Sequence, residues 1–309
     1  MMIHLFTHPR TRSQLYGSLL LVLGSLVLVG CGRRNDLGPV ATVDASEKIR
    51  EALTAGGAGG EATAAVATGT GWGTLKGKFL FDPDVEPREM EPYNVNKDMA
   101  ACTIDGKAPL QQTLLVDPAT RGIANVAVFV RSASRVHESA QASEGEAVFD
   151  QKVCVFLTHV FPLRLGQTMV IKNSDPVGHN TNIEGKNSFN QTIPVDAAIN
   201  FKPQKEEAVP VGVRCSIHPW MLAYFLPRAN GYVAVTAADG SFEIPNLPAG
   251  EDLEFQVWHE SAVPGKLLVL TTPEAKELKW SKKGRFKVKL AEDEVKEVNL
   301  TVPAAALGG

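Results

Sequence analysis

From residue 72 onward the chain is a succession of short segments in which apolar and polar residues alternate, with turn residues between them. Residues 74–81 alternate in this way and end at Asp82-Pro83, and residues 123–130 form a second such segment. No stretch of this region keeps a helical period for more than one or two turns. The pattern predicts an all-β protein built from sandwiches or barrels of antiparallel strands.

Two successive groups of strands are expected after the polar loop at residues 132–146. The first group comprises segments at 153–157, 162–165, 168–173, 208–214 and 231–236. The second comprises a turn-strand-turn pattern at 239–250 and alternating segments at 253–259, 285–290 and 295–302. Their regular short spacing is typical of β-sandwiches.

The first thirty residues have the features of an export signal. Arg10 and Arg12 form a charged flank, and residues 15–30 are an uncharged apolar run that is short for a membrane-spanning helix. Residues 28–31, Leu-Val-Gly-Cys, resemble the lipobox of bacterial lipoproteins, which implies removal of residues 1–30 and lipid on Cys31. The alternative is an uncleaved N-terminal anchor. Both alternatives place the folded part in the bacterial cell envelope, on the periplasmic side or at the outer membrane.

Residues 31–71 are predicted to be a flexible linker between the lipid and the folded part. The glycine-rich residues 56–60 and the Ala/Thr/Gly run after them offer little apolar surface to bury.

The formal net charge of the whole chain is -3, with both signs mixed along the sequence. Such a chain has no basic footprint, so nucleic acid is not expected as a partner.

A thiol, an imidazole and a thioether lie together on one short segment, at Cys215, His218 and Met221, and His179 lies 36 residues before Cys215. Two imidazoles, a thiolate and a weak thioether are the ligand set of a blue copper centre. Taken alone, the Cys-x-x-His motif also fits half of a structural zinc site, but no second cysteine pair accompanies it. Met221 alone would more often fill a core. The joint pattern favours copper.

Two segments around these residues resemble the ligand segments of cupredoxins. They are residues 173–180, Asn-Ser-Asp-Pro-Val-Gly-His-Asn, and residues 215–221, Cys-Ser-Ile-His-Pro-Trp-Met. The resemblance covers roughly residues 162–236 and is nearest in spacing to the amicyanin and plastocyanin-like branch. It implies a cupredoxin-like Greek-key sandwich over residues 72–236, with strands added at its N-terminal end.

The resemblance also implies a role for each residue around the metal. The ligands of one mononuclear type 1 copper ion would be His179, Cys215, His218 and Met221. Asn180 would hydrogen-bond near the thiolate and tie the two ligand segments together. In this family the second histidine reaches the surface at an apolar patch, so His218, with Pro219 and Trp220 beside it, is expected at a docking face for a redox partner.

The C-terminal residues resemble a different domain. Residues 239–242, Asp-Gly-Ser-Phe, and 247–250, Leu-Pro-Ala-Gly, resemble the carboxypeptidase regulatory-like, transthyretin-type β-sandwich. The resemblance implies a smaller sandwich over residues 237–303. The segments at 74–81 and 123–130 also fit the opening of such a domain. The cupredoxin-like part is then alternatively an insertion between those segments and the C-terminal strands.

The remaining cysteines, Cys102 and Cys154, are expected to form a disulfide, because export places them in an oxidising compartment. The alternative is a metal site that uses Cys154 and His159. Alternation along a strand would put those two side chains on opposite faces, which makes a shared metal unfavourable. His137, His159 and His259 are expected to be structural or surface residues.

The sequence therefore predicts a membrane-anchored type 1 copper protein that carries single electrons to and from an unidentified redox partner protein. A copper ion with four protein ligands has no open position for a substrate, and no paired carboxylates or nucleophile motif accompany the site, so an enzyme is not expected. The alternatives are a copper-binding or carrier lipoprotein, and a non-redox envelope module in which the C-terminal sandwich binds a glycan or a protein.

Overall fold

The computed structural model of the protein describes residues 70–263 and 265–308. The predicted signal at 1–30, the lipidation residue Cys31 and the linker up to residue 69 lie outside these residues. Within the described residues, no helix is both long and apolar enough to cross a membrane. The structure is almost entirely β, which confirms the predicted all-β class.

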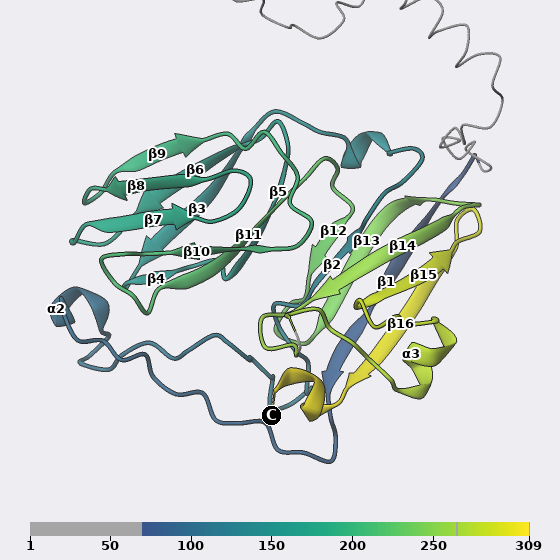
Figure 1. Cartoon of the computed structure of the whole chain (residues 1–309), viewed down its shortest axis with the longest axis horizontal. Helices are drawn as coiled ribbons and strands as arrows, with labels where there is room; N and C mark the ends of the chain where they lie inside the picture. Colours follow the sequence, from purple (N-terminus) through teal and green to yellow (C-terminus); the bar gives the residue numbers. More distant parts are fainter. Residues whose placement is uncertain (1–69, 264, 309) are drawn as a thin grey trace, which may run out of the picture. The chain divides into compact units, whose positions relative to one another are not determined.

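Strands from the middle of the chain form two sheets that pack on each other, and we call this the first sandwich (Figure 1). These strands are β3 (Glu146–Lys152), β4 (Val155–Phe156), β5 (Val160–Arg164), β6 (Thr168–Asn173), β7 (His179–Ile183), β8 (Phe189–Ile193), β9 (Ala198–Phe201), β10 (Val211–Arg214) and β11 (Leu222–Arg228). A five-stranded sheet has the order β5-β11-β10-β7-β8, and a four-stranded sheet has the order β4-β3-β6-β9.

The core of the first sandwich follows from the alternation seen in the sequence. In β6 the side chains of Met169 and Ile171 point inward while their neighbours are half-buried or exposed. Phe149 on β3 stacks on Phe156 of β4, with ring centroids 5.1 Å apart. The sheets are mixed rather than purely antiparallel, because β3 pairs with β6 and β5 with β11 in parallel. Such pairs require crossover connections, which alternation within one strand cannot reveal.

The other strands form the second sandwich. They are β1 (Trp72–Phe81), β2 (Ala127–Val130), β12 (Val233–Val235), β13 (Ser241–Pro248), β14 (Asp252–Trp258), β15 (Arg285–Lys289) and β16 (Val295–Val302). A three-stranded sheet has the order β13-β1-β16, and a four-stranded sheet has the order β12-β2-β14-β15. The short helix α3 (Pro273–Glu277) connects β14 to β15, η1 (Glu138–Ala140) lies between β2 and β3, and η2 (Ala304–Leu307) follows β16.

The strand pairing determines how the two sandwiches share the chain. β1 pairs with β13 and β16, and β2 pairs with β12 and β14. The first sandwich therefore lies in sequence between β2 and β12, which is the insertion that the sequence left open. β1 and β16 approach closely at Gly77, where a Cβ atom would lie 1.8 Å from the carbonyl oxygen of Val298. A side chain has no room at that point.

Residues 82–122, which we call the strap, connect β1 to β2 and contain the short helix α2 (Met99–Cys102). The strap leaves the second sandwich, brings α2 to the edge of the first sandwich and returns (Figure 1). The predicted disulfide between Cys102 and Cys154 is formed, and it joins α2 to the turn between β3 and β4. The irregular segment is thus fastened to the first sandwich through one covalent bond.

Candidate metal centre

The predicted ligands lie at the ends of neighbouring strands of the five-stranded sheet. His179 begins β7, Cys215 follows β10 directly, and Met221 comes immediately before β11. Because β7 and β11 both pair with β10, the two ligand segments lie at the same end of this sheet. All four side chains are removed from solvent: His179 and His218 are 0% exposed, Met221 1% and Cys215 2%.

Three of the four predicted donors converge on one point. The Nδ1 atoms of His179 and His218 lie 2.9 Å apart, and the Sγ atom of Cys215 lies 3.9 Å from Nδ1 of His218. One donor atom from each of the three residues lies within 4.8 Å of the others. Metal–nitrogen bonds of about 2.0 Å place two nitrogens of one ion roughly 3.3 Å apart, so this arrangement suits a single ion after a small expansion. Met221 packs in the same buried cluster as Cys215.

Backbone hydrogen bonds fix the Cys215 sulfur. The N–H groups of Asn180 and His218 donate to Sγ at 3.2 and 3.3 Å. The loop closes through the N–H of Met221, which donates to the carbonyl of His218 at 3.0 Å. Hydrogen bonds to a cysteine sulfur tune the redox potential of a blue copper centre. These backbone hydrogen bonds by themselves orient the sulfur of Cys215.

Asn180 makes hydrogen bonds with residues of both neighbouring segments. Its Oδ1 atom accepts hydrogen bonds from the backbone N–H and the hydroxyl of Ser216, at 3.2 and 3.0 Å. Its Nδ2 donates to Oδ1 of Asn190 and to the carbonyl of Gln191 on β8, at 2.9 and 3.0 Å. Asn180 thus joins the segment that carries His179 to the segment that carries Cys215.

Asp175 is a neighbour of the site that the sequence did not single out. Its Oδ2 atom lies 2.7 Å from Nε2 of His179 and accepts the N–H of Cys154 at 2.8 Å, while Oδ1 accepts the N–H of Val153 at 2.6 Å. A carboxylate on Nε2 leaves Nδ1 of the same ring free to bind a metal. The available signal was the position of Asp175 four residues before His179, in the Asn-Ser-Asp-Pro turn.

Asp98 is a second neighbour that was not anticipated, and it explains a difference from the expected surface. Its Oδ2 atom lies 2.9 Å from Nε2 of His218. His218 was expected at the surface, but the strap covers it and leaves it 0% exposed. Asp98 lies 120 residues from His218 in sequence, so no local pattern links the two.

The protonation states suit a metal site. Burial by itself would raise the pKa of the Cys215 thiol, but the hydrogen bonds from His179 and the neighbouring amides outweigh it and lower that pKa. Burial lowers the pKa of His218, and Asp98 offsets only part of this effect. For His179, burial acts in the same direction, but the contacts with Asp175 and Cys215 raise its pKa above the ordinary value. A thiolate and a neutral His218 are the forms that bind metal, and a bound ion would replace the proton on His179.

The residues proposed for docking are accessible to different degrees. Pro219 is exposed, whereas Trp220 is half-buried and donates from Nε1 to the carbonyl of Cys154 at 3.1 Å. The Trp220 ring lies 5.2 Å from the ring of His218.

His159 pairs with Glu260 and is not close to the donors, so the alternative site with Cys154 does not form.

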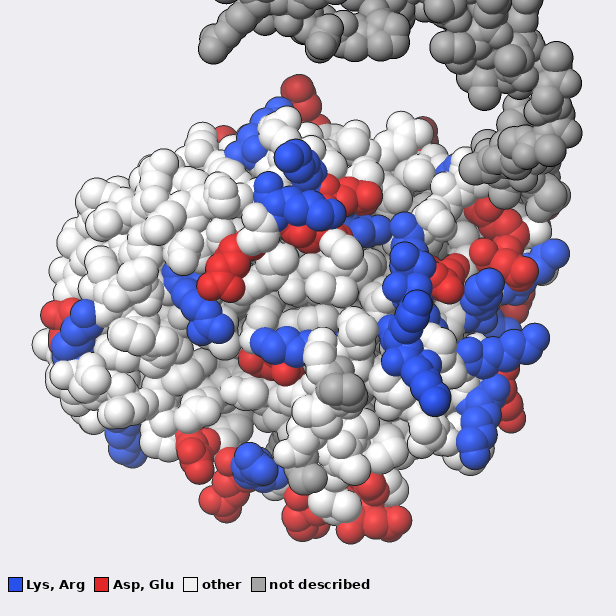
Figure 2. Space-filling view, in the orientation of Figure 1, with Lys and Arg blue, Asp and Glu red and all other residues white. Residues whose placement is uncertain are grey.

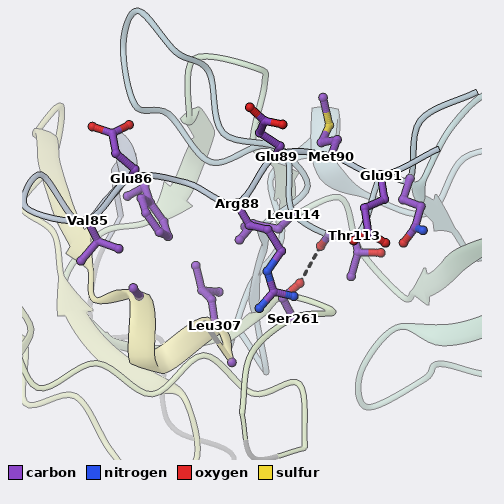
Figure 3. A pocket seen from close by; sticks show the side chains of 14 residues that line it. Val85, Glu86, Arg88, Glu89, Met90, Glu91, Thr113, Leu114, Ser261 and Leu307 are labelled. Atoms are coloured by element: carbon purple, nitrogen blue, oxygen red, sulfur yellow. Dashed lines mark hydrogen bonds between the residues drawn. The ribbon is translucent and has the colours of Figure 1, made fainter.

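A pocket of about 320 Å³ lies elsewhere, between the strap and the residues around η2. Figure 3 shows the acidic side chains of Glu86 and Glu89 at its rim and the apolar side chains of Val85 and Leu307 lining it. None of the four predicted ligands lines this pocket. The donor cluster is therefore not part of this open cavity.

The chain resembles several solved copper proteins. A reduced Cu(I) form of an amicyanin mutant is 19% identical and covers 33% of this chain and 98% of its own, with a TM-score of 0.25. The amicyanin of Paracoccus versutus is 19% identical and covers 33% of this chain and 97% of its own, with a TM-score of 0.25. The copper-containing nitrite reductase of Thermus scotoductus SA-01 gives 17% identity, 27% of this chain, 22% of its own and 0.25.

No protein-family model matches the chain, and no curated protein does. The case for a metal site therefore rests on the positions of His179, Cys215 and His218 in this chain itself.

Proposed function

We propose that this chain is a type 1 copper protein that carries single electrons at the cell envelope. The observation that carries the proposal is the convergence of the Nδ1 atoms of His179 and His218 beside the buried sulfur of Cys215. In the proposed centre Met221 would be the weak fourth ligand. Copper, when bound, supplies a one-electron redox couple, and the rigid donor set limits the rearrangement between its two states.

The proposal includes anchoring through lipid on Cys31 and a redox partner that docks near Pro219 and Trp220. Over the side of the molecule that carries α2, Figure 2 shows few charged side chains, which supports a mainly uncharged contact. Transient electron-transfer contacts are small, so a limited face of this kind suffices. With four protein ligands the ion offers no open position to a substrate, and we propose no enzymatic activity.

The test is copper binding by the full chain in detergent. Cu(II) is added and the visible and paramagnetic resonance spectra are recorded, with Cys215→Ser and His179→Ala as variants and His137→Ala as a histidine control away from the site. An intense thiolate-to-copper band that is lost in both site variants and kept in His137→Ala supports the proposal. A wild-type chain that binds no copper contradicts it.

A copper-binding or carrier role is the second candidate, and the complete burial of His218 favours it, because a covered imidazole is a poor exit for electrons. A carrier needs tight binding but no defined reduction potential. Wild-type chain that binds one copper ion without the thiolate-to-copper band, or whose copper does not exchange electrons with a small soluble oxidant, would favour this role. A non-redox envelope module is the outcome if neither metal binding nor electron exchange is observed.

A further inference from the structure

Asp98 is placed unusually at the start of α2. Its backbone has φ 50° and ψ 35°, a left-handed conformation that aspartate tolerates better than most residues. Aspartate at this position ordinarily caps the helix with its side chain, but here the side chain makes no cap hydrogen bond. The carboxylate turns to Nε2 of His218 instead. The local geometry therefore favours contact with His218 over stabilisation of the helix.

The disulfide determines where Asp98 lies. The carbonyl of Asp98 accepts the N–H of Cys102 at 3.0 Å, and Cys102 is bonded to Cys154. Cys154 in turn donates its N–H to Asp175, whose carboxylate contacts His179. A continuous path thus runs from one ligand imidazole to the other: His179, Asp175, Cys154, Cys102, Asp98, His218. Both cysteines are 0% exposed, so the path is buried in its central part.

Asp98 is the outermost group of this path. Its side chain is 42% exposed, whereas that of His218 is 0% exposed. Within residues 70–263 and 265–308, Asp98 forms one ion pair, and its partner is His218. Removal of this carboxylate would open the edge of the imidazole that carries Nε2 to solvent.

We propose that Asp98, held in place by the Cys102–Cys154 disulfide, is a positioning residue that orients His218 and closes the metal centre on the strap side. This inference rests on the proposed copper function for its metal-dependent part. The carboxylate accepts Nε2–H and so directs Nδ1 of His218 toward the ion. Its negative charge stabilises the more positive oxidised metal, so it lowers the reduction potential. The strap then separates the Nε2 edge of His218 from solvent.

The first test uses the full chain without metal. Diethyl pyrocarbonate modifies accessible imidazoles, and peptide mass spectrometry resolves each histidine. Asp98→Ala is compared with Asp105→Ala, an exposed aspartate of the same strap that also has φ 50°. We expect His218 to change from unmodified to a rate similar to that of the partly exposed His137 in Asp98→Ala, and to stay unmodified in Asp105→Ala. Equal protection of His218 in both variants overturns the proposal.

The second test uses copper. Loss of the hydrogen-bond partner of a metal-binding histidine typically weakens metal binding by about 10–100-fold, so we expect copper release to a chelator to be about tenfold faster or more in Asp98→Ala. Asp98→Asn keeps the shape and removes the charge, and we expect a higher midpoint potential than in wild type. Asp98→Glu restores the negative charge, so we expect its midpoint potential to lie below that of Asp98→Asn. A purely structural role for Asp98 predicts no shift of potential in Asp98→Asn, and that result contradicts the proposal.

The role of the disulfide is tested with the paired variant Cys102→Ala/Cys154→Ala, which retains Asp98. We expect His218 to become accessible here as in Asp98→Ala, with circular dichroism confirming that the sheets remain folded. If this variant unfolds, Asp98→Ala alone still decides the positioning role. If the wild-type chain binds no copper, the proposed function fails while the metal-free measurement still decides whether Asp98 covers His218.

Discussion

The Oδ2 atom of Asp175 lies 2.7 Å from Nε2 of His179, and the same carboxylate accepts the backbone N–H groups of Val153 and Cys154. Those two residues form the turn between β3 and β4 and have φ values of 55° and 52°. A turn with two positive φ values usually contains Asn or Gly, and valine is costly there. Asp175 therefore stabilises an unfavourable turn and orients a predicted ligand at the same time.

Asp175→Ala should reduce both stability and metal binding. Buried hydrogen bonds to a charged group contribute about 1.5–3 kcal/mol each, so we expect the free energy of unfolding to fall by about 3 kcal/mol or more. Loss of the contact with Nε2 of His179 should also weaken metal affinity by about 10–100-fold. Denaturant unfolding and copper titration measure the two effects. Asp196→Asn, at an exposed aspartate whose positive φ asparagine also tolerates, is the control and should change neither quantity.

Met221→Leu separates the role of the thioether in the core from its role at the metal. The two side chains have similar volumes, and such exchanges usually cost less than about 1.5 kcal/mol. We expect the metal-free chain to keep its stability within that limit, while the copper form shows a higher midpoint potential and a changed spectrum, because the axial ligand tunes the potential. An unchanged potential and spectrum would assign Met221 to the core alone.

His259 should make stability depend on pH. Burial lowers its pKa to about 4, from an ordinary value near 6.5, and its Nδ1 accepts the N–H of Ser261 at 3.2 Å. Between those two values the unfolded chain binds a proton that the folded chain does not. The contribution of neutral His259 to the free energy of unfolding is therefore complete above about pH 6.5. It is lost as the pH falls toward 4, by about 3 kcal/mol in total.

Urea unfolding from pH 7.5 to 4 measures this dependence. His259→Asn retains an acceptor for Ser261. In this variant the loss of unfolding free energy between pH 6.5 and 4 should be smaller than in wild type by about 3 kcal/mol. His137→Asn is the control and should keep the wild-type slope. The pKa of Asp175 is also lowered, because hydrogen bonds from His179 and the turn amides outweigh its burial, but its effect on stability falls below this pH range. Parallel curves for wild type and His259→Asn would contradict the prediction.

The sequence contained the information for the parts of this molecule that are local. Alternation in β1 and β6 is visible because each strand buries one face, and the spacing of Cys215, His218 and Met221 places three donors on one loop. The Cys102–Cys154 disulfide followed from counting the cysteines left over in an exported chain. These features depend on neighbouring residues or on composition.

The features that escaped the sequence depend on distant residues. β1 pairs in parallel with β16, more than 200 residues later, and nothing within either strand encodes that register. Asp98 contacts His218 only because the strap crosses from one sandwich to the other. The burial of His218 is a consequence of that crossing, and the family resemblance, which begins near residue 162, does not include the strap.

Tyr224 on β11 and Trp258 on β14 meet edge to face, with ring centroids 4.7 Å apart, at the contact between the two sandwiches. The surrounding buried cluster combines Ala127 and Phe129 of β2 with Val160 and Leu226 of the first sandwich. The Tyr224 hydroxyl also donates to Glu260 at 3.1 Å, and burial together with that carboxylate raises the pKa of the tyrosine. The tyrosine therefore remains protonated and bonded across the interface.

Trp258→Ala should show that the two sandwiches unfold together. Truncation of a buried tryptophan costs about 3–5 kcal/mol, and here the cavity opens at the interface. We expect the loss of copper absorbance, which reports on the first sandwich, and the loss of far-ultraviolet circular dichroism to shift together to lower denaturant. Trp280→Ala, which removes a half-buried ring packed on Phe286 inside the second sandwich, is the matched control for size. If the copper signal keeps its wild-type midpoint in Trp258→Ala while the remaining sheet signal shifts, the two sandwiches are independent and the interface does not couple them.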